Sequence, residues 1–186
     1  DAYEGNWVND NKEGQGKATL IADGITYEGN FKNGLFHGSG QYRSNIGDAY
    51  DGEWKSGKQD GQGIYRSSIG DKYEGTWLNG MKHGEGSYEF VDGNKYDGEW
   101  ENDQITGKGI FTFSNGSICR GIFSNGKIDG EGKYDYANGD QHIGSFKLGK
   151  REGQGTCTFS NGDIYVGEWK DDQINGQGEF TYRNGN

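Results

Sequence analysis

Cysteine is scarce in this sequence, with two residues in 186, and hydrophobic residues make up only 29% of it. So few cysteines exclude a disulfide framework of the kind that holds small secreted domains together. The sequence also lacks a signal peptide and any apolar run long enough to span a bilayer. The simplest explanation of these absences is that the protein is cytoplasmic.

Basic residues are also in the minority, with 19 Lys and Arg against 29 Asp and Glu and a net charge of −10. They form no cluster along the sequence. Nucleic acids and anionic lipid surfaces both require a basic protein surface. The composition therefore argues against a nucleic-acid partner and against direct binding to an anionic membrane.

Glycine, by contrast, is abundant and regularly placed, with 37 residues. The motif YEGTW begins at Tyr73, and its variant YDGEW begins 23 residues later at Tyr96. Such self-similarity marks a repeat array. The pattern includes both ends of the sequence, so we expect a piece of a longer array. Eight repeats start at Tyr3, Tyr27, Tyr50, Tyr73, Tyr96, Cys119, His142 and Tyr165, with one extra residue near Asp23 in the first.

The repeat positions, numbered from 0 at the first residue of each repeat, indicate strands. Positions 2, 11 and 13 are always glycine, position 4 is always Trp or Phe, and position 15 is mostly aromatic. Positions 0, 2 and 4 and positions 13, 15 and 17 keep a period of two, which is strand spacing. The polar, glycine-containing segments between them indicate turns. The sequence thus predicts an all-β fold: an elongated, twisted, single-layer antiparallel meander of eight hairpins, forming one repeat array over residues 1–186.

A register for this sheet follows if position 4 lies opposite position 13, position 2 opposite 15, and position 0 opposite 17. Most aromatic rings then have a glycine on each flanking strand and can lie flat over bare backbone. A cross-strand ring compensates for the weakness of a strand glycine. In this register, a valine at Gly75 would collide with the rings of Tyr65 and Tyr88.

The pattern YEGxWxxGxxxGxG, which runs from Tyr73 to Gly86, resembles the MORN repeat, and the resemblance covers all eight repeats. It implies an elongated, twisted sheet of hairpins. Family members include membrane-contact proteins, lipid-kinase regulatory segments, a histone methyltransferase appendage and protist cortical scaffolds, so the fold does not fix the function. Frequent Asn, Ile and Lys fit an AT-rich protist genome, which makes an apicomplexan cytoskeletal or cell-division scaffold our expectation.

Catalysis finds no support in these motifs. The Gly-x-Gly pairs lack the strand-to-helix context of a phosphate loop, and they recur in every repeat. The carboxylates of Glu74, Asp97 and Glu99 recur in the same way, which is typical of a solvated face. We therefore expect a protein that is not an enzyme and has no catalytic residues.

The aromatic face is the better functional candidate, because the chain offers no second layer to cover it. An exposed apolar groove of this size usually binds a partner, and its acidic rims would suit a basic, partly apolar peptide or helix. The alternative is that the rings only pack on their own sheet. The predicted groove residues are Tyr50, Trp54, Tyr73, Trp77, Tyr96 and Trp100.

Two functions from different classes follow. The first is a non-enzymatic cytoskeletal or cortical scaffold that binds protein partners and itself. The second, implied by the family resemblance, is a phospholipid-binding module at the cell cortex, against which the missing basic patches count. Vesicle co-sedimentation would discriminate between them.

The face opposite the rings changes character in the later repeats. Acidic residues at position 1 give way to Arg120, Ile143 and Val166, and Ile122 stands at position 3. Apolar residues in place of a charged stripe indicate a contact surface. We expect a two-fold homodimer through the last three repeats; the alternative is a chance scatter of exposed apolar residues.

Cys119 and His142 replace the position-0 tyrosine in two consecutive repeats, and both are zinc ligands. They should lie in one row about 10 Å apart, across two strand spacings. Two chains could then supply Cys₂His₂ to a shared ion. Cys157 is a spare candidate, expected diagonal to His142. The alternative is that small residues simply make room in these repeats.

Overall fold

The computed structural model describes residues 1–184, and these contain sixteen antiparallel strands in one open sheet. Each strand is hydrogen-bonded to its neighbour in the sequence, so the order in the sheet is the order in the chain. The predicted all-β meander of eight hairpins is confirmed. Residues 1–184 contain no helix that is long and apolar enough to cross a membrane.

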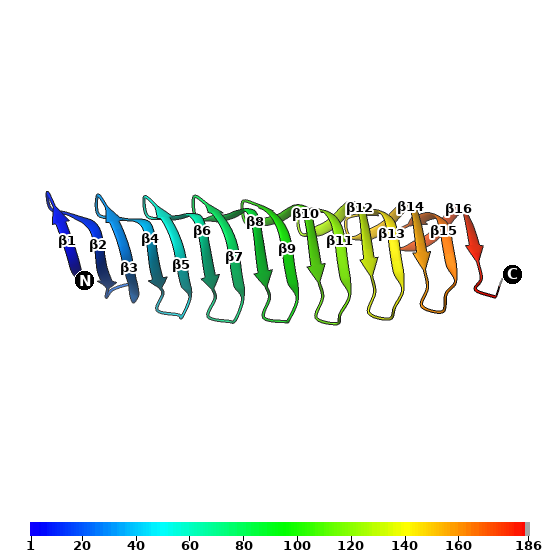
Figure 1. The fold of residues 1–186 in the computed structure, drawn as a ribbon, viewed down its shortest axis with the longest axis horizontal. Coiled ribbons are helices and arrows are strands. Elements are labelled where there is room, and N and C mark those ends of the chain that lie inside the picture. Colours follow the sequence, from blue (N-terminus) through cyan, green and yellow to red (C-terminus); the bar gives the residue numbers. More distant parts are fainter. Residues whose placement is uncertain (185–186) are drawn as a thin grey trace. The chain divides into compact units, whose positions relative to one another are not determined.

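The strands, which are labelled in Figure 1, fall into two compact units, and we describe these separately. Unit 1 holds Asp1–Val91 with Glu101–Asp103, and unit 2 begins with Asp92–Trp100 and continues from Gln104. The strands of unit 1 are β1 Ala2–Val8, β2 Asn11–Leu20, β3 Ile25–Lys32, β4 Leu35–Arg43, β5 Ala49–Lys55, β6 Lys58–Arg66, β7 Lys72–Leu78 and β8 Met81–Glu89. Those that follow are β9 Lys95–Glu101, β10 Gln104–Thr112, β11 Ile118–Ser124, β12 Lys127–Asp135, β13 Gln141–Lys147, β14 Lys150–Thr158, β15 Ile164–Lys170 and β16 Gln173–Thr181.

A two-residue turn closes the hairpin inside each repeat. In the fourth repeat Asn79 and Gly80 form it, with φ of 53° and 87°, and Leu78 pairs with Met81. Two consecutive residues with positive φ are the requirement of a type I′ turn, whose twist matches that of the flanking strands. Asp10, Asp103 and Asp172 replace the glycine in three repeats and also have positive φ, between 61° and 68°.

The register differs from the predicted one by two to four residues. Tyr73 pairs with Tyr88 and Gly75 pairs with Gly86, so tyrosine lies opposite tyrosine and glycine opposite glycine. Trp77 pairs with position 9 of its own repeat, and across the preceding strand it pairs with Gly61 at position 11. The predicted pairing of position 4 with 13, and of 2 with 15, is therefore wrong.

The two-residue turn and a bulge together cause this difference. The turn fixes the pairing of the residues next to it, and the register then shifts between Gly75 and Trp77. Gly84, at position 11, has a φ of 62° and supplies the left-handed backbone that the bulge needs. The invariant glycine at position 11 is thus a bulge residue, and only the glycines at positions 2 and 13 lie beneath rings.

The rings do lie over bare backbone, but each lies diagonally rather than directly across. A Cβ built on Gly86 would stand 2.5 Å from Cε2 and 2.6 Å from Cζ of Tyr73. One built on Gly75 would stand 2.5 Å from the Cα of Gly86 and 2.8 Å from the Tyr73 hydroxyl oxygen. The expected collision of a side chain at Gly75 with Tyr65 and Tyr88 is therefore wrong, because the obstacles are Tyr73 and the facing backbone.

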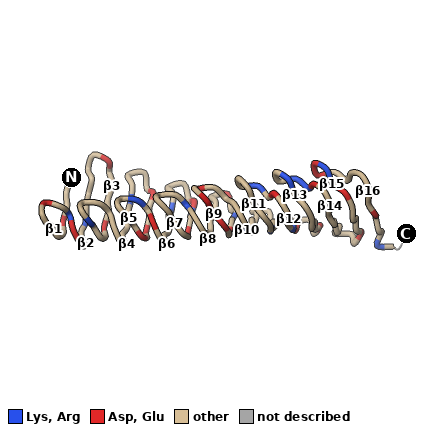
Figure 2. The backbone as a smooth tube through the Cα atoms, turned by 90° about the horizontal axis from the view of Figure 1, so that it is seen from above, with Lys and Arg blue, Asp and Glu red and all other residues tan. Residues whose placement is uncertain are grey.

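Side-chain oxygens, most of them carboxylates, tie loops between repeats to the next loop along the sheet. Asp48 accepts hydrogen bonds from the Ser68 backbone N–H at 2.8 Å and from the Tyr65 hydroxyl at 2.9 Å. Asp71 repeats both bonds one repeat later. Figure 2 shows that such acidic residues are interspersed with basic ones along each unit. Part of the negative charge therefore has a structural use.

Candidate partner-binding face

The ring face of unit 1 is built around tyrosines at position 0 and tryptophans at position 4. Tyr50 lies edge-on to Trp54 at 5.0 Å between ring centroids and to Trp77 of the next repeat at 5.3 Å. Tyr73 and Trp77 repeat the contact at 5.1 Å. Edge-to-face packing of this kind is favourable, and here it runs continuously from repeat to repeat.

The polar atoms of these rings are satisfied within the sheet. The Tyr50 hydroxyl donates to the Glu53 carbonyl at 3.0 Å, and the Trp77 Nε1–H donates to the Gly63 carbonyl at 3.3 Å. Burial raises the pKa of the equivalent Tyr27 to about 12, so its hydroxyl stays protonated and keeps donating. The hydroxyl of Tyr50 and the indole N–H of Trp77 are thus already engaged within the sheet.

The six predicted groove residues are all buried. Tyr50, Tyr73 and Tyr96 are at most 1% exposed, and the three tryptophans Trp54, Trp77 and Trp100 are 5–6% exposed. Since a side chain this covered offers almost no contact area, these residues form the core of the sheet. The prediction that they line an accessible surface has to be corrected, while partner binding on the ring face stays a prediction.

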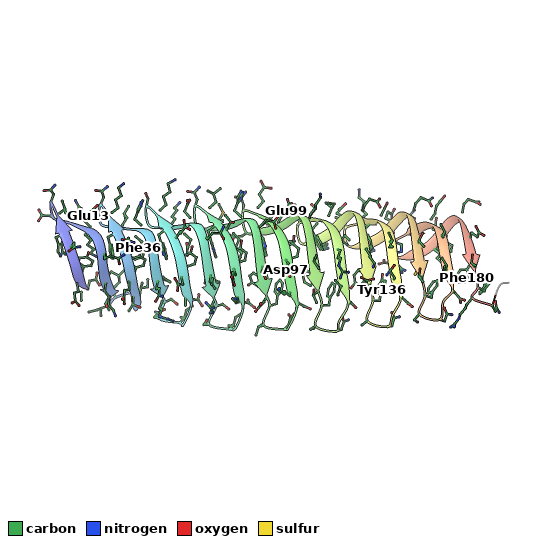
Figure 3. The ribbon with its side chains drawn as sticks, in the orientation of Figure 1. Glu13, Phe36, Asp97, Glu99, Tyr136 and Phe180 are labelled. Carbon is green, nitrogen blue, oxygen red and sulfur yellow. The ribbon has the colours of Figure 1, made fainter. Side chains whose placement is uncertain are left out.

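Accessible ring surface on this face lies instead at positions 15 and 17, and in unit 2 it forms two groups of contacting rings, Phe111 to Tyr136 and Phe159 to Tyr182. Phe113 stacks on Tyr134 at 5.7 Å, and Tyr134 stacks on Tyr136 at 4.3 Å. Phe180 and Tyr182 are 38% and 49% exposed. Figure 3 labels Tyr136 and Phe180 among these side chains. We call this set the ring ladder: Phe111, Phe113, Tyr134, Tyr136, Phe159, Phe180 and Tyr182.

The aromatic residues at position 17 are the signal that could have located this surface from the sequence. Serine holds that position in two repeats of unit 1, at Ser44 and Ser67. There the Tyr65 hydroxyl is bonded to Asp48 at 2.9 Å, and the Ser67 Oγ accepts from the Asp71 N–H, also at 2.9 Å. The corresponding face of unit 1 is consequently more polar than the ring ladder.

Cys119, His142 and Cys157 all lie in the position-0 and position-15 row of unit 2. Tyr134 separates Cys119 from His142, so these two are two strands apart, and Cys157 pairs directly with His142 rather than diagonally. All three are at most 2% exposed. Burial raises the pKa of the Cys119 thiol to about 12 and lowers the pKa of His142 to about 4.

His142 fills the tyrosine slot without making the tyrosine's hydrogen bond. Its ring lies edge-on to Phe146 at 5.2 Å and to Trp169 at 5.1 Å, and neither of its nitrogens has a hydrogen-bond partner. Within residues 1–184, no three His, Cys, Asp or Glu side chains converge as a metal site would require. Binding of zinc by Cys119 and His142 would thus depend on a second chain, and it stays a prediction.

The four residues predicted to form a dimer interface lie on the face opposite the rings. Arg120 makes an ion pair with Asp135 at 2.6 Å. Ile122 is 37% exposed, and Ile143 and Val166 are each 50% exposed. The structure thus offers apolar surface at these positions, and dimerisation through it is still a prediction.

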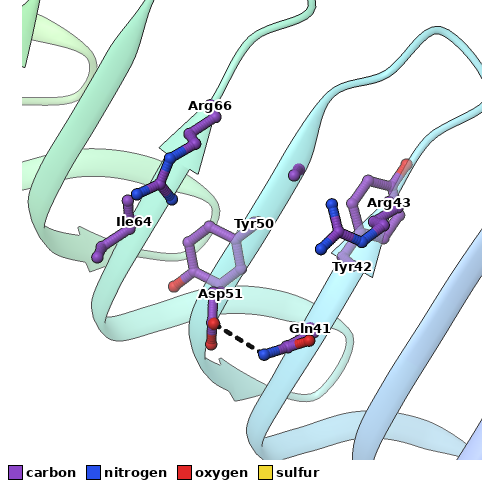
Figure 4. A pocket seen from close by; sticks show the side chains of 8 residues that line it. Gln41, Tyr42, Arg43, Tyr50, Asp51, Ile64 and Arg66 are labelled. Atoms are coloured by element: carbon purple, nitrogen blue, oxygen red, sulfur yellow. Dashed lines mark hydrogen bonds between the residues drawn. The ribbon is translucent and has the colours of Figure 1, made fainter.

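A shallow hollow of about 230 Å³ opens on the same opposite face in unit 1, between β4, β5 and β6. Figure 4 shows Arg43 and Arg66 at its sides, with the side chain of Gln41 donating to Asp51 at 2.9 Å across its floor. The hollow exists because Ala49, between the two arginines in the cross-strand row, has almost no side chain. No other described group of the chain fills it.

A family model described as the MORN repeat matches eight segments that together span almost the whole chain. They are residues 3–20, 27–49, 50–72, 73–95, 96–118, 119–141, 142–164 and 165–186. No curated protein matches the sequence.

Two solved structures share the fold. The TCP domain of SAS-4 (dCPAP) of Drosophila melanogaster, in complex with a proline-rich motif of Ana2 (dSTIL), matches with a TM-score of 0.50 and 15% identity, covering 80% of this chain and 81% of that one. The G-box domain of the microcephaly protein CPAP matches with a TM-score of 0.55 and 11% identity, covering 90% and 86%. At such low identity the likeness concerns the fold alone.

Proposed function

Because the chain belongs to the MORN repeat family, whose repeats present one regular face, we propose that it is a non-enzymatic scaffold that binds protein partners on its ring face. The observation that carries the proposal is the ring ladder. Its rings are half-buried to exposed, and they lie in two groups of contacting rings on one side of a single-layer sheet. An apolar surface of this kind is typical of a binding site.

The ligand we propose is an extended, basic segment rich in proline. Proline-rich segments are already fixed in the polyproline II conformation, and they dock on surfaces lined with aromatic rings. The complex of the SAS-4 TCP domain with a proline-rich motif supports this class of ligand for an open sheet of the same fold. The net charge of −10 favours a basic segment by long-range attraction.

Two peptides of equal length test this proposal by calorimetric titration into the full chain. One is proline-rich with interspersed lysines, and the other carries glutamates in place of the lysines. We expect saturable binding of the basic peptide, weakened by added salt, and much weaker binding of the acidic one. Equal binding of both, or of neither, would contradict a ring face that selects basic ligands.

The alternative function, a phospholipid-binding module at the cell cortex, has a distinct readout. Co-sedimentation with vesicles that contain phosphatidylserine should leave the wild-type chain in the supernatant at physiological salt. Sedimentation with the vesicles would favour the lipid function instead. For the cellular setting we propose a cytoplasmic location at the cytoskeleton or the cell cortex. The likeness to the CPAP G-box domain, for which a role in centriole elongation has been suggested, supports this setting.

Self-association is the second part of the proposed function. Two copies would meet through the exposed apolar side chains of Ile122, Ile143 and Val166, beside Arg120. A closed, two-fold pairing is the commonest form for such a contact.

Zinc is a further proposal that depends on this dimer, with Cys119 and His142 from two copies as ligands. Elemental analysis of protein purified without chelator tests it, together with Cys119→Ser and His142→Ala. Stoichiometric zinc that is lost in both variants would support the site. Zinc well below one ion per dimer would reject it.

A further inference from the structure

Two isoleucines stand almost fully in solvent at the tips of loops in unit 1. Ile46, in the loop between β4 and β5, is 68% exposed, and Ile69, in the loop between β6 and β7, is 69% exposed. Ile21 and Val91, at the loops on either side, are 69% and 63% exposed. One edge of unit 1 therefore carries an aliphatic side chain at every loop between repeats.

In unit 2 the equivalent position 19 is asparagine, at Asn115, Asn138 and Asn161. Those asparagines stabilise the turn: Asn138 and Asn161 each accept a hydrogen bond at 3.0 Å from the backbone N–H two residues later. Asparagine is preferred in turns for this reason. The polar residue is thus the ordinary solution at this position, and isoleucine is the exception.

The loops that carry Ile46 and Ile69 reach the same turn without help from position 19. The Ser44 Oγ accepts from the Asp48 N–H at 3.0 Å, and the Ser67 Oγ accepts from the Asp71 N–H at 2.9 Å. The turn hydrogen bond from the Gly70 N–H to the Ser67 carbonyl, at 3.1 Å, matches that of Gly116 to Phe113 in unit 2, at 2.9 Å. Ile46 and Ile69 therefore contribute nothing visible to the fold, and residues that break a local rule without a structural gain point to function.

The tips are held in a row, because consecutive loops touch. A Cβ built on Gly47 would stand 3.5 Å from the Ser68 Cβ, and one built on Gly70 would stand 3.2 Å from the Val91 Cγ2. Loops of consecutive repeats are two strand spacings apart, about 9.6 Å. Ile46 and Ile69, which hold the same repeat position, are thus one such step apart, while Ile21 and Val91 stand one position earlier in their repeats.

Cations stand directly beside these tips. Arg43 and Arg66 are the residues immediately before the two loops, both are exposed, and in the described part of the chain neither makes an ion pair. Arg66 pairs across the sheet with Lys72, and the hollow over Ala49 lies between the two arginines. Asp48 and Asp71 lie in the same two loops, but their carboxylates are hydrogen-bonded to the next loop, and among residues 1–184 neither forms an ion pair with Arg43 or Arg66.

We propose that this edge of unit 1 binds an acidic amphipathic helix of a partner protein. A helix with an apolar residue at every seventh position repeats that residue about every 10.5 Å, close to the step between the isoleucine tips. Acidic side chains next to this apolar row would reach Arg43 and Arg66, which are suited to bidentate carboxylate recognition. This surface is separate from the ring ladder and recognises the opposite charge.

A synthetic helical peptide with leucine at every seventh position and glutamates beside the leucines is the probe, titrated into the full chain. We expect saturable binding that Ile46→Asn with Ile69→Asn weakens at least tenfold. These asparagines are native to the same turn in unit 2, so the variant should melt like the wild type. Arg43→Gln with Arg66→Gln should weaken binding similarly and reduce its dependence on salt.

The matched control is Leu148→Asn, which removes a 63% exposed aliphatic side chain from unit 2 and should leave the affinity unchanged. Substitutions in the ring ladder should also leave it unchanged, which separates this proposal from the proposed function. Three results would overturn the proposal: unchanged affinity in the isoleucine variant, equal binding of a peptide with lysines for glutamates, or isoleucine-dependent sedimentation with phosphatidylserine vesicles. The last would assign the edge to a membrane surface.

Discussion

Single glycines decide where the large rings of this protein can lie. Glycines at position 13, such as Gly86, lie under the tyrosine of their own repeat. At position 2, a side chain on Gly75 would have the Cα of the facing glycine on the next strand as its nearest neighbour. The sequence was sufficient to predict that rings cover bare backbone. It could not show which ring covers which glycine, because that depends on a register shift of the kind that a bulge produces.

Gly86→Ala should destabilise the chain by roughly 1–3 kcal/mol, because its methyl group would have to displace the Tyr73 ring. Thermal and urea unfolding measure the loss. The control is Gly126→Asn, at a turn where φ is +76° and nothing lies within 4 Å, and it should change stability by less than about 0.5 kcal/mol. Equal effects of the two substitutions would mean that the ring does not lie on Gly86.

His142 should make stability depend on pH. Burial lowers its pKa to about 4 in the folded chain from an ordinary 6.5, so the unfolded state binds the proton more readily. The contribution is complete above pH 6.5 and is lost as the pH falls towards 4. At pH 5.5 the loss is on the order of 1–2 kcal/mol.

The variant His142→Tyr restores the residue of the other repeats and is the reference for this effect. Its melting temperature should fall less than that of the wild type between pH 7 and pH 5.5, because the carboxylates that also titrate are common to both chains. Identical pH profiles would show that His142 is not held neutral by burial.

Hairpins and their loops are the next level of organisation, and they were predictable only in part. Alternation of glycine and aromatic residues was enough to predict the strands, since a period of two has no helical counterpart. The turn at Asn79–Gly80 could have fixed the start of the register, because its two residues leave Leu78 to pair with Met81. The bulge that follows this turn cannot be recognised in the sequence by its glycine, because glycines also occupy repeat positions that are not bulged.

Contact surfaces were harder to predict than strands. A single-layer sheet has no covering layer, and on that ground the sequence predicts exposed tryptophans at position 4. They are buried because the position-0 rings of their own and the preceding repeat pack edge-on against them, and long residues at position 9 lie over them. Trp169, for instance, contacts Tyr165 and His142, and Arg151 stands 4.1 Å from its ring centroid. Side chains of one sheet can cover each other, which the sequence pattern alone does not show.

The loop carboxylates should carry measurable stability. Asp48→Ala removes the acceptor of the Ser68 N–H and of the Tyr65 hydroxyl, and we expect a loss of about 1–2 kcal/mol by urea unfolding. Asp51→Ala is the matched control, because its only described hydrogen bond is to the exposed Gln41, and its effect should stay below about 0.5 kcal/mol. A loss at Asp51 as large as that at Asp48 would contradict the special role of the loop bonds.

The chain as a whole presents different surfaces in its two units. Unit 2 carries the ring ladder and the exposed Ile143 and Val166, whereas unit 1 carries isoleucine tips beside arginines. The same repeat therefore yields surfaces of different chemistry by changes at positions 1, 17 and 19, while the glycines at positions 2, 11 and 13 stay fixed. Such a division of one array fits a scaffold that holds several partners at once.

Self-association through unit 2 predicts a dimer for the full chain in light scattering. Ile143→Asp with Val166→Asp places two charges on the proposed contact and should give a monomer with an unchanged melting temperature. Leu78→Asp, at a 41% exposed position of unit 1, should remain dimeric. A monomeric wild type, or a dimer that persists in the double variant, would contradict this interface.

The central claim is that the ring ladder, and not the buried tryptophan row, is the contact surface for partners. Calorimetric titration of the basic proline-rich peptide into the full chain and into Phe113→Ser with Tyr136→Ser tests it most directly. The reference is Trp7→Ala, which removes a 57% exposed ring from unit 1. We predict at least tenfold weaker binding by the ladder variant and unchanged binding by the reference; equal affinities of the ladder variant and the wild type would contradict the account.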